Sequence, residues 1–399
     1  MTDDRMQARR IFDAGVKAAD PYLAVTRSVQ GVVVPKLIVA VGKAASLMAK
    51  AALGVFPGTR TIVVTNYENA KEMAGVTVYA AGHPVPDENG AVAARAVTDA
   101  LQQVDGPVLA LISGGGSALL PAPAGDILLA DKAQVNELLL GSGLPIEKMN
   151  LIRQHLSALK GGGMLRHSAP HPVTALILSD VVSDDLSAIA SGPTVPPIGT
   201  ASDAMALLHQ AGLWGRLPQR IRDHLMAAVD PAPLPPATNI LVGSNQQSVT
   251  AMALAAPDAI RLRAPVEGDV ADAASLICDQ AGVGTTIWGG ETTVVLNGTG
   301  QGGRNQEIAL RIAQEADFRG WRDWVCLQGG SDGRDGPTDS AGGLVDQGTV
   351  GRIVAAGGDI EALLYNNDSY AALNLANDLL MIGATGTNVA DLGVLIRRA

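Results

Sequence analysis

Five short turns in this chain combine glycines with cationic or acidic residues, and each follows an apolar run. They are Gly42-Lys43, the SGGGS segment at 113–117, the acidic turn at 179–185, the GGE segment at 289–291 and the GGSD segment at 329–332. Ligands of open α/β sheets gather at the carboxyl ends of the strands, where glycine amides can meet phosphates or carboxylates. The turns therefore predict an enzyme that handles a small anionic substrate, and their residues suggest phosphoryl transfer.

Two of these turns carry the strongest anion-binding pattern. Lys43 is expected at the start of a helix after the strand at 37–41, where the positive end of the helix dipole disfavours a cation unless an anion compensates it. A solvated first-turn lysine is the alternative. The consecutive glycines of the second turn can form a nest of backbone amides, or simply a flexible turn. The anion-binding residues predicted here are Ser113, Gly114, Gly115, Gly116 and Ser117.

Acidic side chains just past strands suggest a magnesium site. Asp180 directly follows the apolar run at 173–178, and carboxylates so placed can hold Mg²⁺ together with substrate phosphates. Glu291 and Asp332 lie in the later turns, where Asp–Gly pairs are also ordinary turn chemistry. The metal ligands predicted from the sequence are Asp180, Glu291 and Asp332.

The segment GTGQGG at 298–303 matches the G-x-G-x-x-G pattern and opens a helix at Arg304. The pattern is typical of dinucleotide-binding folds, although glycine-rich chains produce it by chance. Arg304 would meet any phosphate bound at this helix start, together with Gly302, Gly303 and Asn305. A P-loop is disfavoured, because Gly42-Lys43 is followed by Ala44. His83 lies in a proline-flanked loop, which explains it nearly as well as acid–base catalysis does.

Length and composition limit the remaining function classes. A chain of 399 residues with 47% hydrophobic residues predicts two domains with packed cores. A net charge of −10 without a basic run disfavours nucleic acid and membranes as partners. Two cysteines exclude a disulfide framework, and the N-terminus lacks a signal-peptide core, so a cytoplasmic protein is expected. The oligomeric state stays open, with a homo-oligomer as one option.

Strand-like and helical runs alternate along the chain and predict an α/β fold with mainly parallel sheets. The apolar runs at 37–41, 61–65, 108–112 and 173–178 are expected strands of a Rossmann-like domain at 1–230. Four prolines around 230–236 predict a linker. A second, smaller α/β domain is expected at 237–399, beginning with a strand at 239–242.

The ordered motifs resemble one family, the class II glycerate 2-kinases, whose C-terminal part is called the MOFRL domain. The likeness extends from about Val39 to Leu392 and rests on AVGKAA, GHPVPDENG, LISGGGSALLPAP, NLIRQHLSALKGG, LSDVVSDDLSAIASGPTVP, GGETTV, GTGQGGRNQE, GGSDGRDGPTDSAGG, NNDSY and GATGTNVADL. Ser183 and Ala384 depart from the family pattern, where glycine and proline are expected.

The resemblance implies transfer of the γ-phosphoryl group of ATP to the 2-hydroxyl of D-glycerate, with Mg²⁺, in a cleft between the two domains. Critical lysine and arginine residues of the family match Lys43 and Arg304. We hypothesise that both stabilise the transferring phosphoryl group, while Asp180 binds metal or accepts the hydroxyl proton. Two alternatives remain: an NAD(P)H-dependent hydroxypyruvate reductase that uses the 298–303 turn, and a periplasmic-type binding protein, which the absent signal peptide disfavours.

Overall fold

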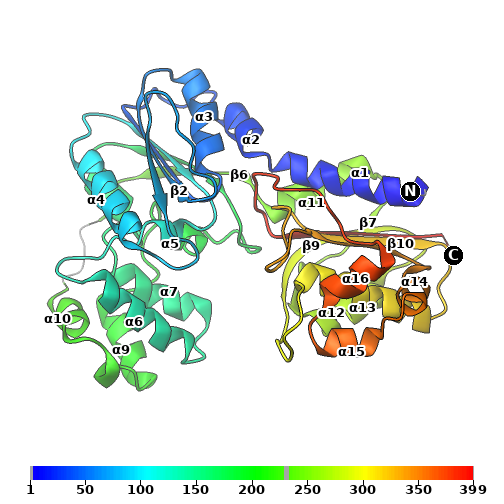
Figure 1. The fold of residues 1–399 in the computed structure, drawn as a ribbon. Helices are drawn as coiled ribbons and strands as arrows, with labels where there is room; N and C mark the ends of the chain where they lie inside the picture. Colours follow the sequence, from blue (N-terminus) through cyan, green and yellow to red (C-terminus); the bar gives the residue numbers. More distant parts are fainter. Residues whose placement is uncertain (1–2, 229–232, 399) are drawn as a thin grey trace. The chain divides into compact units, whose positions relative to one another are not determined.

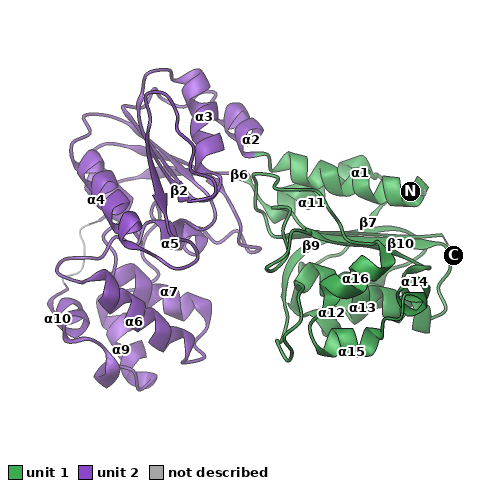
Figure 2. Cartoon of the chain, in the orientation of Figure 1, with its two compact units in different colours: residues 1–20, 243–399 green, residues 21–242 purple. Residues whose placement is uncertain are grey.

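The computed structural model describes residues 3–228 and 233–398. The chain forms two compact units (Figure 2). Residues 21–242 make up one, called here the N-terminal unit; residues 1–20 and 243–399 make up the other, the C-terminal unit. Of the predicted linker, residues 230–232 lie outside the described residues.

The N-terminal unit contains a six-stranded sheet with the strand order β3-β2-β1-β4-β5-β6 (Figure 1). Strands β1 to β5 pair in parallel, and the order reverses between β1 and β4, which is the Rossmann arrangement. The predicted α/β, Rossmann-like fold is therefore confirmed. The strands are β1 (Leu37–Val41), β2 (Arg60–Asn66), β3 (Thr77–Ala81), β4 (Val108–Ile112), β5 (Val173–Leu178) and β6 (Ala237–Gly243).

Helices cover this sheet on both faces, which explains why its central strands are apolar without alternation. All five residues of β1 and of β4 are buried. Helices α2 (Pro21–Ser28) and α3 (Ala45–Val55) contact β5, β1 and β4. On the other face, Val39 and Val41 share a core cluster with residues of α4 (Glu88–Gln102) and α8 (Gly163–Ser168).

A separate helical cluster belongs to the same unit. Leu139, Ile152, Leu208 and Leu225 form its buried centre. Its helices are α6 (Leu129–Leu140), α7 (Ile146–His155), α9 (Ala201–Gln210) and α10 (Gln219–Ala227). The short helix α5 (Gly116–Leu119) and the 3₁₀ turns η1 (Ile189–Ser191) and η2 (Trp214–Arg216) complete the unit.

The C-terminal sheet is mixed, so the expectation of mainly parallel sheets is wrong for this unit. Its order is β11-β10-β12-β9-β7, with β8 also paired to β9. Strands β10, β11, β12 and β9 pair antiparallel, and only the β7 and β8 pairings to β9 are parallel. The strands are β7 (Ile260–Arg261), β8 (Val266–Asp269), β9 (Gly284–Thr293), β10 (Trp324–Gly330), β11 (Gly342–Asp346) and β12 (Asp391–Arg397).

Alternating side chains of this sheet enter two different cores. Val394 and Ile396 pack with Phe12 of α1 (Asp3–Ala18), whereas Leu395 packs with the helices of the opposite face. Helix α11 (Asn245–Ala255) lies beside α1 (Figure 1). The other helices are α12 (Val270–Gln280), α13 (Arg304–Phe318), α14 (Thr349–Ala355), α15 (Ile360–Tyr365) and α16 (Ser369–Ala376).

Three segments differ from the sequence-based expectations. Helix α1 packs on the C-terminal sheet, although the sequence placed it in a domain at 1–230. The strand expected to open the second region is β6, which pairs with β5 as the last strand of the first sheet. The GGE segment at 289–291 lies inside β9 rather than in a turn.

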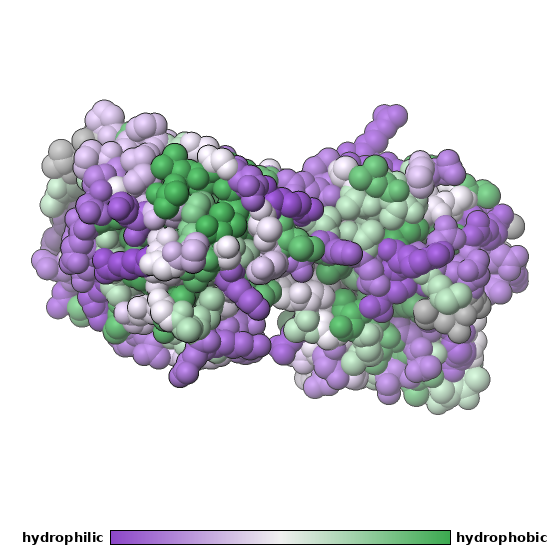
Figure 3. Space-filling view, turned by 90° about the horizontal axis from the view of Figure 1, so that it is seen from above, coloured by the Kyte–Doolittle hydropathy of each residue, from purple (hydrophilic) through white to green (hydrophobic). Residues whose placement is uncertain are grey.

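The described helices include none that could cross a lipid bilayer, because each is too short or too polar. On the face drawn in Figure 3, hydrophobic residues occur in small groups between hydrophilic ones.

Candidate functional site

The loop after β1 is held tightly against the loop after β4. The Oγ of Ser113 accepts a hydrogen bond from the amide of Ala44 at 3.1 Å and donates to the carbonyl of Val41 at 3.3 Å. The amide of Lys43 donates to the carbonyl of Gly114 at 2.9 Å. Ser113 is buried, so its hydroxyl positions the lysine loop rather than facing a ligand. These bonds fix the backbone of Lys43 at the switch point of the sheet.

The glycine turn after β4 presents unused donors beside this lysine. Gly115 adopts a left-handed conformation with φ of 84°, which favours glycine. Within the described residues, no acceptor takes the amides from Gly114 to Ser117, and none accepts from the ammonium of Lys43. The Oγ of Ser117 instead pairs with that of Ser191 at 2.7 Å. These amides are therefore available to an anion, and anion binding by the turn stays a prediction.

Asp180 lies directly over this turn, at the end of β5. A Cβ placed on Gly114 would lie 2.1 Å from the Oδ2 of Asp180, so only glycine lets the carboxylate come so close. Farther along the same loop, the Oδ1 of Asp184 is buried without a hydrogen-bond partner. Asp185 instead accepts from the amide and the hydroxyl of Ser187. The structure thus brings Asp180 together with the nest and Lys43.

His83, which the sequence left undecided, belongs to the same group. Its Cδ2 would lie 2.9 Å from a Cβ on Gly115, and the Cγ of Lys43 would lie 3.4 Å from the same point. Burial, followed by the charge of Lys43, lowers the pKa of His83 below its ordinary value. A neutral imidazole therefore faces the nest at pH 7. The sequence shows that His83 lies in a proline-flanked loop, but it contains no signal that this loop packs against Gly115 and Lys43.

In the C-terminal unit, Arg304 begins α13 and is held by two carboxylates. Its Nε and Nη2 donate to Asp391 at 2.7 and 3.1 Å, and its Nη1 donates to Glu291 at 2.9 Å. Burial opposes the charge of Arg304, but the two carboxylates raise its pKa above the ordinary value. Burial raises the pKa of Asp391 to about 6, and its bonds to Arg304 limit the rise. Asp391 thus anchors one edge of the guanidinium, while the exposed Glu291 takes an outer nitrogen.

Asn305 is buried next to this arginine, and its side chain bonds to three other side chains of the protein. Its Nδ2 donates to Asp391 at 2.9 Å and to Asp335 at 3.2 Å, while its Oδ1 accepts from Gln328 at 2.7 Å. Asp335 also takes the amides of Asn305 and Gln306, at 3.1 and 2.8 Å. The chain's own carboxylate therefore occupies the start of α13. Sequence reasoning missed both Asp391 and Asp335, because no spacing rule links them to residue 305.

The GTGQGG turn at 298–303 uses its amides within the protein. The side chain of Asn367 accepts from the amides of Asn297 and Gly298, at 2.7 and 3.0 Å. Asn366 and Asp368 accept from the next three residues of the turn. A Cβ on Gly302 would lie 2.1 Å from the Oγ of Ser369. Packing against residues 366–369 therefore explains these glycines. Several amides that could bind a pyrophosphate are already bonded within the protein.

The predicted metal ligands do not gather into one cluster. Glu291 pairs with Arg304, and the Oδ1 of Asp332 accepts from the amide of Arg334 at 3.0 Å. Among the described residues, no group of three or more His, Cys, Asp or Glu side chains could hold a metal ion. The three-carboxylate magnesium site stays a prediction, as do the contacts of Gly302, Gly303 and Asn305 with a nucleotide.

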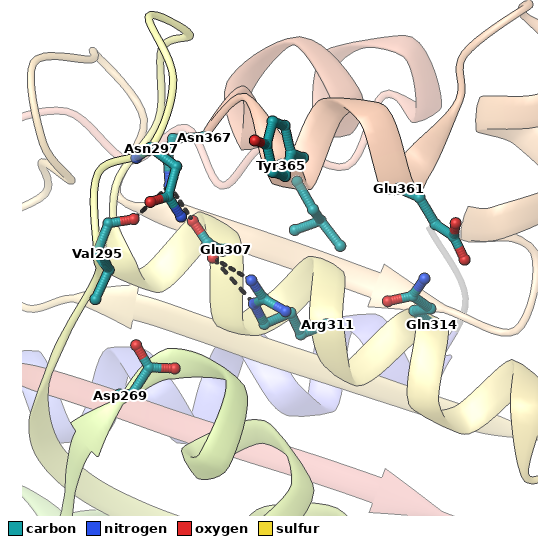
Figure 4. A pocket seen from close by; sticks show the side chains of 10 residues that line it. Asp269, Val295, Asn297, Glu307, Arg311, Gln314, Glu361, Tyr365 and Asn367 are labelled. Atoms are coloured by element: carbon teal, nitrogen blue, oxygen red, sulfur yellow. Dashed lines mark hydrogen bonds and ion pairs between the residues drawn. The ribbon is translucent and has the colours of Figure 1, made fainter.

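The C-terminal unit also holds a polar cavity of about 370 Å³ (Figure 4). Glu307 lies in its wall, bonded to Arg311 and to Asn367 (Figure 4). The predicted site residues are absent from its described lining. Glu307 and Arg311 are paired with each other, and Glu307 also accepts from Asn367, which holds the 298–303 turn, so this wall supports that turn.

Comparison with known proteins identifies the family. Residues 284–391 match the MOFRL family, and residues 7–226 match a domain of unknown function, DUF4147. A D-glycerate 2-kinase from Thermotoga maritima is 36% identical, with 96% of each chain covered. The chain belongs to the MOFRL family of glycerate kinases. The resemblance inferred from the motifs is thereby confirmed.

Two further comparisons extend this kinship. A crystal structure of glycerate kinase from Thermotoga maritima matches with a TM-score of 0.92 at 35% identity, covering 98% of this chain and 99% of that one. An Agrobacterium vitis relative named "Putative hydroxypyruvate reductase" is 38% identical, covering 98% of this chain and 94% of the relative. This member of the glycerate kinase family therefore has relatives that carry two different activity names.

Proposed function

We propose that the protein is an ATP-dependent glycerate 2-kinase, which transfers the γ-phosphoryl group to the 2-hydroxyl of D-glycerate and yields 2-phosphoglycerate. The observation that carries the proposal is the nearly full-length kinship to an enzyme named D-glycerate 2-kinase. The site of the N-terminal unit supports it, because the loops after β1, β4 and β5 bring together a lysine and backbone amides that no described residue engages, with a carboxylate beside them. Phosphoryl transfer requires this combination of charge and positioning, with little covalent work by the protein.

The N-terminal unit would hold the reacting anion. The amides from Gly114 to Ser117 would bind phosphate oxygens, and Lys43 would neutralise charge on the transferring group. Asp180 would accept the proton of the attacking hydroxyl or orient the hydroxyl toward phosphorus. Because backbone hydrogen bonds join the Lys43 loop to the nest, the geometry of these two groups exists before substrate arrives.

Arg304 would bind phosphoryl oxygens through its outer guanidinium nitrogen. Two of its nitrogens are fixed by the buried Asp391, so the plane of the guanidinium is set. The third nitrogen contacts the exposed carboxylate of Glu291, which an incoming phosphoryl oxygen could replace at little cost in packing. Asp391 and Asn305 would then be positioning residues.

Magnesium is implied by the family, and the residues of the N-terminal unit fit it. The carboxylate of Asp180 beside the nest and the unpartnered Oδ1 of Asp184 are oxygen donors, which Mg²⁺ prefers. These two residues would hold the ion, with water and phosphate oxygens as the other ligands. When bound, the ion would partly neutralise the negative charge of the phosphates.

The deciding experiment identifies the product. The protein is incubated with ATP, Mg²⁺ and D-glycerate, and the products are resolved by ³¹P NMR against authentic 2- and 3-phosphoglycerate. We expect 2-phosphoglycerate. Formation of 3-phosphoglycerate would contradict the assigned regiochemistry, and absence of both products would contradict the kinase proposal.

The reductase named among the relatives is tested in parallel. Hydroxypyruvate is mixed with the protein and NADH or NADPH, and the absorbance at the nicotinamide band is followed. No oxidation above background is expected, because the amides of the 298–303 turn are bonded to Asn366, Asn367 and Asp368.

A further inference from the structure

A cavity of about 450 Å³ lies in the N-terminal unit, next to the glycine nest. Its walls come from α6, α7 and the loop at 84–86. It shares Ser117 with the nest, and three cations line it: Lys132, Arg153 and Lys160. None of these cations has a place in the mechanism proposed above, although the cavity adjoins its anion-binding turn.

Lys160 is buried, and its side chain has no partner within residues 3–228 and 233–398. Lys160 is only 6% exposed, and no described residue accepts a hydrogen bond from its ammonium. Burial, followed by the charge of Arg153, lowers the pKa of Lys160 to about 8. The side chain also borders the space beneath Gly116, beside Val41 and Ala190. An amine buried in this way without an acceptor either loses its proton or is stabilised by an anion, and a bound anion would keep it charged.

The other two cations bond only to neutral groups. Arg153 donates from Nε and Nη2 to the Oδ1 of Asn136, at 3.1 and 2.5 Å, and from Nη1 to Asn150 at 3.4 Å. Lys132 donates to the carbonyl of Pro121. Glu137 is the one carboxylate of the described lining; it is exposed and forms no ion pair with the three cations. The cavity therefore gathers three basic side chains that no carboxylate of its described lining neutralises, in a chain whose net charge is −10.

The rest of the wall is apolar. Val135, Leu139 and Leu156 are buried in it, whereas Val85 and Leu140 are 73% and 61% exposed at its rim. A ligand that fits such a cavity needs several negative charges and a broad apolar surface. A nucleotide has both, in its polyphosphate and its base. Glycerate has one carboxylate and two hydroxyls, and would leave most of the volume unfilled.

We propose that this cavity binds the nucleotide, with the phosphates on Lys160, Arg153 and Lys132 and the base against the apolar wall. The terminal phosphate then lies toward the nest, because Ser117 lines this cavity and Gly116 lines a smaller space together with Lys160. This assignment rests on the proposed kinase function for the identity of the anion. Glycerate, the acceptor, would then bind on the side of the nest that faces away from this cavity.

Calorimetric binding tests the assignment without turnover. A non-hydrolysable ATP analogue with Mg²⁺ and D-glycerate are titrated separately into wild type and Lys160→Met. Loss of one charge-assisted contact should weaken analogue binding about 10- to 100-fold and leave glycerate binding within about twofold. Lys148→Met is the matched control, since Lys148 is an exposed lysine of α7, and it should change neither affinity.

The outcomes separate the sources of the anion. Weakened glycerate binding with normal analogue binding would overturn the nucleotide assignment and place a carboxylate in the cavity. Unchanged affinities for both would overturn the cavity as a binding site. A second measurement needs no variant: amine acetylation of the wild-type protein, mapped by mass spectrometry, should be suppressed at Lys160 by the analogue and not by glycerate. If the protein binds the analogue through Lys160 but forms no phosphoglycerate, the proposed function fails while the cavity assignment stands.

Discussion

The carboxylate of Asp180 lies against the backbone of Gly114, so closely that a Cβ on Gly114 would be 2.1 Å from Oδ2. A Cβ atom cannot lie that close to an oxygen. Alanine at position 114 must therefore displace either the carboxylate of Asp180 or the nest. This contact joins the loop after β5 to the loop after β4, and it places an acceptor beside the unused amides.

Gly114→Ala should therefore lower kcat about 100-fold or more, because it moves Asp180 and the nest together. Steady-state kinetics measure the loss, and circular dichroism reports whether the fold persists. Gly54→Ala is the control: Gly54 lies in α3 with open space around it, so alanine there should leave kcat unchanged and raise stability by about 0.5–1 kcal/mol. Normal turnover in Gly114→Ala would remove the contact from the mechanism.

Lys43→Met should lower kcat by about 10²–10³, the usual effect of losing one donor that stabilises transition-state charge. The fold should survive, since the lysine side chain has no hydrogen-bond acceptor among the described residues. Lys50 is an exposed lysine of α3, the helix that follows the Lys43 loop, and Lys50→Met should keep wild-type kinetics. A Lys43 variant that retains more than about a tenth of the activity would argue for a merely solvated side chain.

Arg304→Lys should lower kcat by a similar factor of about 10² while keeping a positive charge beside Asp391. Arg304→Ala is the poorer test, because it leaves Asp391 buried without its cation and costs about 3–5 kcal/mol of stability. Arg311→Lys is a matched control on α13, where Arg311 pairs with Glu307 four residues earlier. Kinetics and thermal melts together separate lost catalysis from lost folding.

Asp180 and His83 compete for the role of proton acceptor, and the pH–rate profile distinguishes them. We expect Asp180→Asn to lower kcat by about 10²–10⁴ and to abolish the acidic limb, while His83→Asn lowers kcat only a few-fold. The reverse pattern would assign the base to His83, whose lowered pKa keeps the imidazole neutral at pH 7.

Lys160 should make stability depend on pH in the alkaline range. Its pKa falls from 10.5 in the unfolded chain to about 8 in the fold, so the unfolded state binds more protons between these values. The free energy of unfolding should thus rise with pH across that window, by about 3 kcal/mol in total. Urea titrations at pH 8 and pH 10 measure the rise.

Lys160→Met should remove the part of that dependence that Lys160 contributes, whereas Lys132, whose pKa burial lowers well below its ordinary value, should keep its own part. An equal pH dependence in the variant would show that the lysine keeps its ordinary pKa.

Local sequence patterns were enough to predict the strands of the N-terminal sheet and the loops that follow them. The strands at 37–41, 108–112 and 173–178 were predicted to the residue, because a strand buried on both faces is a continuous apolar run bounded by turn residues. Lys43 and the glycine nest follow such runs directly, so local pattern alone placed them at strand ends. The family motifs then supplied Arg304.

Which of those residues bond to other groups of the protein is visible only in the folded chain. Hydrogen bonds between residues 30 to 90 positions apart occupy the start of α13 and the glycine turn, and they hold Arg304 through Asp391. The packing of α1 on the C-terminal sheet and the unpartnered Lys160 are likewise long-range facts. Sequence patterns report local conformation and burial, whereas partner choice depends on which surfaces the completed fold brings together.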